Sequence, residues 1–307
     1  MEERTYMEER TYIEDEARME DGAQMEDGAF KKTIADCRVV RLLGRGAFAR
    51  VYLVENERGE QSACKLCDNI ALLRQEAEIQ RAVRHPLFPE DLDFQQEDGT
   101  GYLLMEYAQG INLDDFLRRG GRLTEQEAVG IAVQLAEGLR YLHGQPTGIL
   151  FRDIKPGNII FMADGSVKLL DFGCACPVGD NPGVAGTPGY AAPEQLRFGG
   201  RLAQNCDVYG LGSTLRAMVG KKCTRRLKKV MEAFTREEPC RRPPDMDWAL
   251  ELLASCRCPA ADGSAVGRRG SLTDMQRALL RGEVLFQRWY VVPERRRFPD
   301  LPKKSNA

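Results

Sequence analysis

Apolar residues before residue 110 come in short runs that are separated by glycines and charged residues. Such runs are typical of β-strands, and the one longer stretch among them favours a helix. The pattern predicts strands at 38–44, 51–54 and 61–66, and a helix at 69–84.

The pattern becomes helical in the middle of the chain. Leu135, Leu139 and Leu142 recur at the spacing of one helix face within the stretch 124–143. The sequence Thr124-Glu-Gln-Glu127 at its start is a capping box, in which two side chains bond to the first backbone N–H groups. A long core helix is therefore expected at 124–143.

A short polar loop lies between two apolar runs at 149–161. Buried apolar flanks hold a loop rigidly, so that it presents its polar side chains with little positional error. Asp153 could accept a proton from an attacking hydroxyl, and Asn158 could offer its amide oxygen to a hard cation such as Mg²⁺. A further apolar strand at 167–170 ends at a second carboxylate, Asp171. A base, an amide oxygen and a carboxylate are the parts of metal-assisted phosphoryl transfer.

The loop sequence Phe-Arg-Asp-Ile-Lys-Pro-Gly-Asn, followed by Leu-Leu-Asp-Phe-Gly, resembles the catalytic loop and metal-binding motif of eukaryotic-type serine/threonine protein kinases, with wording closest to bacterial members. The resemblance implies an α+β, two-lobed protein-kinase-like fold with a small β-rich N-lobe, one main helix in that lobe, and a larger helical C-lobe. The expected segments are an acidic repeat tail, the N-lobe, the C-lobe and a basic extension, at 1–33, 34–108, 109–255 and 256–307.

A glycine loop at 44–49 lies between two predicted strands, and its glycines let backbone N–H groups approach phosphates closely. Ala49 replaces the third glycine, and one methyl group need not block a phosphate. Lys65 lies inside an apolar strand, where a lysine is costly unless it is paired. In the family this lysine pairs with ATP phosphates and with a helix glutamate. Glu76 and Glu78 are both available, and the family's spacing favours Glu76.

The resemblance also implies the nucleotide contacts. They are Leu43, Gly44, Gly46, Val51, Ala63, Lys65, Met105, Glu106, Ala108 and Ile160. Met105 would lie beside the adenine pocket, and Glu106 and Ala108 would offer backbone groups, so that their side chains carry little information. Mg²⁺, with Mn²⁺ as an alternative ion, would be held by Asn158 and Asp171. Lys155 would reach the transferred phosphoryl group, which makes the catalytic set Asp153, Lys155, Asn158, Lys65 and Glu76.

Residues 186–195 resemble the substrate-docking segment of the family, in which Thr187 would bond to the catalytic loop. Two structural contacts are implied further along the chain. Asp207 would bind backbone N–H groups of the catalytic loop, and Arg242 would pair with Glu194.

The chain departs from the family in three places. Phe151 replaces the usual histidine before Arg-Asp and can still pack on Phe172, so we interpret it as a tolerated apolar replacement. Asn112 and Gly157 replace two carboxylates that read substrate arginines in basophilic kinases. No Ser, Thr or Tyr lies at 174–185, although the family's phosphate-binding arginine is present. We therefore hypothesise that this segment is ordered without phosphorylation.

Composition and charge exclude other functions. A hydrophobic content of 43% and a charged content of 29% are ordinary for a globular protein, and a net charge of −2 argues against nucleic acid as the main partner. No apolar run approaches the ~20 residues that cross a bilayer. The acidic start of the chain has no signal-peptide core, so a cytoplasmic location with free cysteine thiols is expected.

The two ends carry opposite charges. Residues 1–30 are repeated hexapeptides with eleven acidic and three basic residues, which predicts disorder, and Thr5 and Thr11 there are candidate phosphoacceptors. From Ser255 onward eleven basic residues stand against five acidic ones, and a helix is expected at 271–289. The charges allow an intramolecular contact between the ends, with a partner or an anionic membrane as the alternative for the basic end.

The predicted function is transfer of the γ-phosphoryl group of Mg-ATP to Ser or Thr hydroxyls of protein substrates, with autophosphorylation. Two other classes stay open. A pseudokinase, which binds ATP as a signalling module, is expected to lack the lysine or a metal ligand, and this chain lacks neither. A small-molecule kinase of the aminoglycoside type would lack the docking segment at 186–195.

Overall fold

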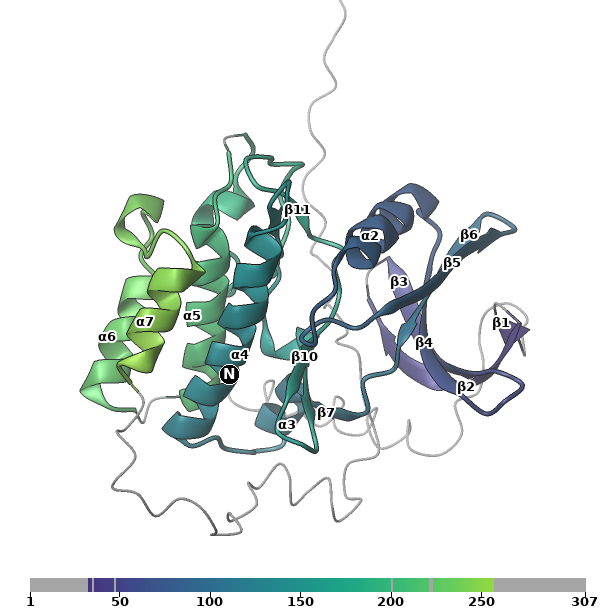
Figure 1. The fold of residues 1–307 in the computed structure, drawn as a ribbon, viewed down its shortest axis with the longest axis horizontal. Helices are drawn as coiled ribbons and strands as arrows, with labels where there is room; N and C mark the ends of the chain where they lie inside the picture. Colours follow the sequence, from purple (N-terminus) through teal and green to yellow (C-terminus); the bar gives the residue numbers. More distant parts are fainter. Residues whose placement is uncertain (1–32, 35, 47, 200, 221–222, 257–307) are drawn as a thin grey trace, which may run out of the picture. The chain divides into compact units, whose positions relative to one another are not determined.

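The computed structural model describes residues 33–34, 36–46, 48–199, 201–220 and 223–256, which form a small β-rich lobe and a larger helical lobe (Figure 1). The α+β, two-lobed fold expected from the sequence is confirmed. The repeat tail, the helix expected at 271–289 and nearly all of the basic extension lie outside the described residues.

The small lobe is one antiparallel sheet with the strand order β1-β2-β3-β4-β6-β5. Its strands are β1 (Thr33–Ile34), β2 (Cys37–Arg45), β3 (Ala49–Glu55), β4 (Gln61–Cys67), β5 (Asp91–Glu97) and β6 (Thr100–Glu106). Val51 and Leu53 in β3 face the core, as expected from the period of two along a strand. The pairing of Gly44 with Val51 places the glycine loop at the end of the β2–β3 hairpin.

One helix, α2 (Ile70–Ala82), packs against β5 and β6. Asn69 caps it, because the Asn69 side chain accepts a hydrogen bond from the backbone N–H of Leu72 (3.2 Å). The helix is slightly shorter than the stretch 69–84 that the sequence predicts. Its buried face carries Leu73, Ala77 and, unusually for an acidic residue, Glu76.

The large lobe contains five helices in the described part of the chain: α3 (Leu113–Arg118), α4 (Glu125–His143), α5 (Asn205–Val219), α6 (Arg225–Phe234) and α7 (Met246–Ala254). The capping box predicted at the start of α4 is present, with Thr124 and Glu127 bonded to each other's backbone N–H groups (2.8 and 3.2 Å). Gly138 on α4 allows close approach of Leu87, since a Cβ at Gly138 would overlap the Leu87 side chain.

Short strands carry the polar loops between these helices. They are β7 (Gly110–Asn112), β8 (Ile149–Leu150), β9 (Ile159–Met162), β10 (Val167–Leu169) and β11 (Cys176–Pro177). β10, β9 and β7 form one small sheet, and β11 pairs with β8. Short 3₁₀ turns occupy Pro156–Asn158, Pro193–Leu196 and Pro239–Arg241.

One apolar cluster connects the helices to the segment that follows α2. It joins the inner faces of α4 and α5 to Leu87 and Phe88, and to Phe151 and Phe172 beside the polar loops. The backbone N–H of Leu169 also donates to the carbonyl of Leu87 (2.7 Å). The residues that hold the candidate site therefore share a core with the end of α2.

The cysteines and the helices add two findings. Cys64 and Cys206 are fully buried, as expected, and burial raises the pKa of the Cys64 thiol to about 12. The described cysteines form no disulfide among themselves. Within the described residues no helix is both long enough and apolar enough to span a bilayer.

Candidate active site

The polar loop between β8 and β9 is held from behind by α5. The carboxylate of Asp207 accepts hydrogen bonds from the backbone N–H groups of Phe151 (2.9 Å) and Arg152 (2.7 Å), as the resemblance implied. Thr214 lies further along α5, and its hydroxyl donates to the carbonyl of Ile154 (2.9 Å). Residues 151–158 are all buried, so the loop has a fixed path.

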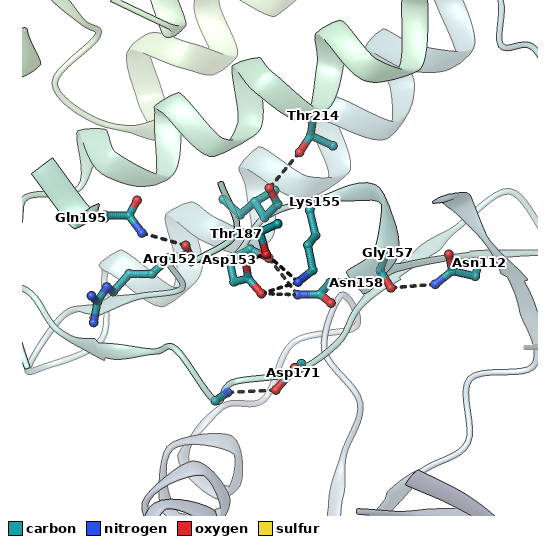
Figure 2. Close-up of polar contacts among 12 residues, drawn as sticks. Asn112, Arg152, Asp153, Lys155, Gly157, Asn158, Asp171, Thr187, Gln195 and Thr214 are labelled. Atoms are coloured by element: carbon teal, nitrogen blue, oxygen red, sulfur yellow. Dashed lines mark hydrogen bonds and ion pairs between the residues drawn. The ribbon is translucent and has the colours of Figure 1, made fainter. Parts of the chain in front are cut away.

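Four polar side chains meet on the outer side of this loop (Figure 2). Asp153 Oδ1 accepts a hydrogen bond from the Thr187 hydroxyl (2.7 Å), and its Oδ2 accepts one from Lys155 Nζ (2.8 Å). Lys155 also donates to Thr187 (2.7 Å), which closes a triangle. The amide nitrogen of Asn158 donates to the carbonyl and to Oδ2 of Asp153 (2.9 and 3.1 Å). The contacts predicted for Thr187 are present.

A second charged cluster joins the small lobe to the end of β10. Lys65 Nζ lies 2.7 Å from both carboxylate oxygens of Glu76 and 2.7 Å from Asp171 Oδ1. Glu78, two residues along α2, is exposed, so the structure selects Glu76 as the sequence did. Gly173 donates its backbone N–H to Asp171 Oδ1 (3.1 Å), and a Cβ there would crowd this carboxylate.

Burial and charge act in opposite directions on these three groups. Burial would raise the pKa of Asp171, but the charge and hydrogen bond of Lys65 outweigh it and lower the pKa to about 2. Burial raises the pKa of Glu76 to about 7, with Lys65 acting against this shift and Asp171 adding to it. For Lys65, burial works against the charged form, but the two carboxylates raise its pKa above the usual range. The ammonium and the Asp171 carboxylate are therefore charged at neutral pH.

Asn158 and Asp171 each carry a hard oxygen donor. Because the Asn158 nitrogen is turned toward Asp153, the amide oxygen points away from it, and Asp171 supplies a carboxylate. No cluster of three or more His, Cys, Asp or Glu side chains that could hold a metal ion occurs among the described residues. A pair of hard oxygen donors without such a cage fits Mg²⁺, which is bound through one or two protein oxygens together with substrate phosphates.

Six of the ten predicted nucleotide contacts lie in two apolar groups. One apolar cluster of the sheet contains Leu43, Val51, Ala63 and Met105. Ala108, which follows β6, packs with Ile160 and Leu170. Gly44 pairs with Val51, and Gly46 donates its N–H to the carbonyl of Ala49 (2.8 Å). The predicted contacts thus come from the sheet, its glycine hairpin, the segment between β6 and β7, and β9.

Three aromatic rings pack behind Asp171. Phe151 meets Phe172 edge-on with ring centroids 5.4 Å apart, as the interpretation of the histidine replacement required. Phe88, from the segment after α2, contacts both rings, at 5.2 Å from Phe172 and 6.3 Å from Phe151. Such aromatic pairs contribute about 0.5–1.5 kcal/mol each beyond their burial. Phe88 supplies packing on a side of Phe151 that the sequence did not indicate.

Two arginines hold the docking segment. Arg242 lies against Glu194 with two hydrogen bonds (2.5 and 2.8 Å), which is the pair that the resemblance implied. Arg152, 2% exposed, donates from Nη2 to the carbonyl of Gly183 (2.7 Å). The Gln195 amide donates to the carbonyl of Arg152 (2.8 Å). Arg152 therefore has a backbone oxygen as a partner within the segment 174–185.

Two functional neighbours were missed from the sequence. His143 ends the helix predicted at 124–143 and was not among the candidate residues, but it is buried and its Nε2 lies 2.8 Å from Asp207 Oδ2. The side chain of Glu106 was expected to carry little information. It pairs with Lys168 on β10 (2.7 Å) and so connects the end of β6 to the large lobe. The apolar spacing of α4 marks His143 as inward-facing, and that was the available signal.

Comparison with known proteins agrees with this geometry. The family model of the protein kinase domain matches residues 37–252. The chain belongs to the protein kinase family. Similar proteins include the probable serine/threonine-protein kinase zyg-1 of Caenorhabditis briggsae, 35% identical over 190 residues, and the serine/threonine-protein kinase PrkC of Bacillus subtilis, 32% identical over 192 residues. The predicted family, eukaryotic-type serine/threonine protein kinases, is confirmed, and bacterial kinases are among the similar proteins.

The relatives are longer proteins than the part that matches. The alignments cover 58% of this chain and 26% and 29% of those two kinases. A probable cAMP-dependent protein kinase catalytic subunit of Encephalitozoon cuniculi is 36% identical over 200 residues, 61% of each chain. The kinase domain is thus the shared part, and this chain spans about a quarter to three-fifths of the relatives it matches.

Proposed function

We propose that this kinase domain transfers the γ-phosphoryl group of ATP to serine or threonine hydroxyls of protein substrates. The observation that carries the proposal is the pair of charged clusters, Asp153 with Lys155 and Thr187, and Lys65 with Glu76 and Asp171. Both clusters are complete in side-chain contacts, and such contacts serve positioning and charge stabilisation, which dominate phosphoryl transfer.

The residues of the two clusters have different tasks in the proposed reaction. Asp153 accepts the proton of the substrate hydroxyl, and Thr187 and Lys155 fix the orientation of its carboxylate. Lys155 lies beside the base and supplies positive charge to the transferred group. Lys65, held by Glu76, directs its ammonium to the phosphates of ATP. The backbone N–H groups of the glycine hairpin, from Gly44 onward, cover those phosphates.

Asn158 and Asp171 would hold Mg²⁺, and Mn²⁺ has the same preference for oxygen donors. When bound, the cation supplies charge neutralisation to the phosphates. The low pKa of Asp171 supports this role, because its carboxylate is ionised at neutral pH. The nucleotide base would lie between the two apolar groups that contain Met105 and Ala108.

The test is incubation of the purified chain with Mg²⁺ and labelled ATP, beside the variant Asp171→Ala, followed by mapping of the modified residues. We expect phosphate on Ser or Thr with the wild-type protein only, and the mapping shows whether Thr5 and Thr11 are targets. Binding of ATP without any transfer, to itself or to generic proteins, would favour a pseudokinase. Phosphorylation of a small-molecule alcohol and not of protein would favour the aminoglycoside class.

We also propose that the segment from Asp171 to Glu194, which includes Thr187, is ordered without phosphorylation, so that activity does not require it. Arg152, which binds a phosphorylated residue in many relatives of this type, has the Gly183 carbonyl as a partner here. The measurement is activity before and after phosphatase treatment, with mass spectrometry of Thr187. We expect unchanged activity; loss of activity that tracks loss of phosphate at Thr187 would contradict the proposal.

Three further points from the sequence stay predictions. They are the segment boundaries, the cytoplasmic location, and the contact between the acidic and basic ends of the chain. The last can be measured by limited proteolysis at low and high salt, because screening weakens contacts between exposed charges.

A further inference from the structure

The start of α6 carries an unusual concentration of positive charge. Arg225, Arg226, Lys228 and Lys229 are all exposed, while the other side of the helix is buried. Lys221 and Lys222 precede the helix in the sequence and lie outside the described residues. We name the four exposed residues the α6 basic face.

These charges work against the helix that carries them. The positive end of a helix dipole is its N-terminus, where acidic residues are favourable and basic ones are not. α6 has no acidic residue in its first turn. Residues that lower the stability of a helix and gain no contact in return indicate a surface with another function.

Compensation within the domain is slight. No ion pair or side-chain hydrogen bond joins the α6 basic face to another described residue. The carboxylate of Glu125, at the start of α4, accepts two hydrogen bonds from Thr224, from its backbone N–H and from its hydroxyl (both 2.7 Å). Glu232 lies one turn further along α6. The four cations are therefore open to a ligand from outside.

We infer that the α6 basic face is a docking surface for an acidic stretch of a protein substrate. This inference rests on the proposed function and adds a substrate class to it. Four cations on little more than one helical turn span about 6 Å of helix axis. Their long side chains widen that reach, so a run of roughly four to six acidic residues in extended conformation covers them.

A peptide fits better than a membrane or a nucleic acid. The apolar residues of α6, Leu227, Val230, Met231 and Phe234, are all buried, so its exposed face offers no side chain for insertion into lipid. A net charge of −2 is not that of a nucleic-acid-binding domain, which is strongly basic as a whole.

The cleft itself offers no carboxylate at the two positions where basophilic kinases read arginine. The Asn112 amide donates to the carbonyl of Gly157 (2.7 Å), and its oxygen accepts from the backbone N–H of Asp114 (3.0 Å). Those positions are used for packing the loop against α3. Recognition outside the cleft raises the local concentration of a substrate without demanding a sequence at the phosphorylated residue.

The test is fluorescence anisotropy of a labelled octaglutamate peptide with the full chain. The variant replaces Arg225, Arg226, Lys228 and Lys229 by Gln, and the matched control replaces Arg50, Arg58, Arg84 and Arg201 by Gln. We expect the α6 variant to bind roughly tenfold more weakly than wild type, and the control to bind within about twofold of it. Circular dichroism melting checks that both variants are folded.

A second arm measures phosphorylation of one protein substrate with and without a terminal octaglutamate tag. We expect the tag to raise kcat/KM for the wild type, and the α6 variant to lose that increase. Equal peptide binding by wild type and the α6 variant would overturn the inference. So would binding of vesicles containing phosphatidylserine, lost in the variant, without any binding of the peptide. Peptide binding lost in the variant, in a chain with no transferase activity, would support the surface while removing the proposed function.

Discussion

The catalytic loop at 151–158 and the glycine hairpin at 44–49 are held in opposite ways. Every residue of the catalytic loop is buried, and its backbone is bonded by side chains of Asp207, Thr214 and Gln195, far along the sequence. The hairpin closes on itself through Gly46 and Ala49, and Phe48 beside them is 84% exposed.

The difference follows from the tasks proposed for the two loops. A proton acceptor and a cation ligand must stay within a fraction of an ångström of the reacting atoms, which requires a rigid support. Backbone N–H groups that cover phosphates can adapt to a ligand as it enters and leaves. The large lobe even accepts left-handed backbone at Arg152 (φ 70°) and Asp171 (φ 78°) to keep its geometry.

The largest expected effect is on the base of the rigid loop. Asp153→Asn keeps the shape of the side chain and an oxygen that accepts from Thr187. It removes the proton acceptor and turns an amide N–H toward Lys155, so kcat is expected to fall about 10²–10⁴-fold. The control is Asp180→Asn, an exposed residue of the next segment. A kcat within about threefold of wild type would remove Asp153 from the mechanism.

The support behind the loop gives the next largest effect. Asp207→Asn replaces one of two charged acceptors that bind Phe151 N, Arg152 N and His143, and we expect about 2–3 kcal/mol less stability in urea unfolding. The exposed Asp247→Asn, which loses one surface ion pair at 3.3 Å, should change stability by less than about 0.5 kcal/mol. Equal stabilities of the two variants would show that the loop does not depend on this anchor.

The fold and the site differ in how much of them the sequence predicts. Local patterns fix α4, its capping box and the strands around the glycine loop, since each depends on neighbouring residues. The positions of Asp153 and Asp171 in the site were readable because both follow apolar runs in a known motif. Glu76 was chosen over Glu78 by spacing, and helix geometry explains why only one of them faces Lys65.

Contacts between distant segments were not readable. His143 and Asp207 are 64 positions apart, and nothing in either segment names the other as its partner. Phe88 meets Phe172 because the segment after α2 returns to the large lobe, a path that depends on the packing of both lobes. Apolar spacing tells which side chains are inward, but it does not tell which of them meet.

A smaller effect is expected in the small lobe. Glu76→Gln removes the charge that holds Lys65, and the loss of one charge-assisted bond predicts an increase of about tenfold in KM for ATP. Glu78→Gln, on the exposed side of the same helix, is the matched control and should leave KM within about twofold. A fall in kcat of similar size for both variants would mean that α2 as a whole, and not this pair, governs the site.

The smallest effect is expected in the adaptable loop. Ala49→Gly restores the glycine that the family usually has at this position, and it adds backbone freedom where β3 begins. If the hairpin works by adapting, KM for ATP changes by less than about threefold, because the Gly46–Ala49 bond uses backbone atoms that the substitution keeps. Stopped-flow binding of a fluorescent ATP analogue separates association from dissociation. A much tighter complex with glycine would mean that the Ala49 methyl group obstructs the phosphates, and that this hairpin is as exacting as the catalytic loop.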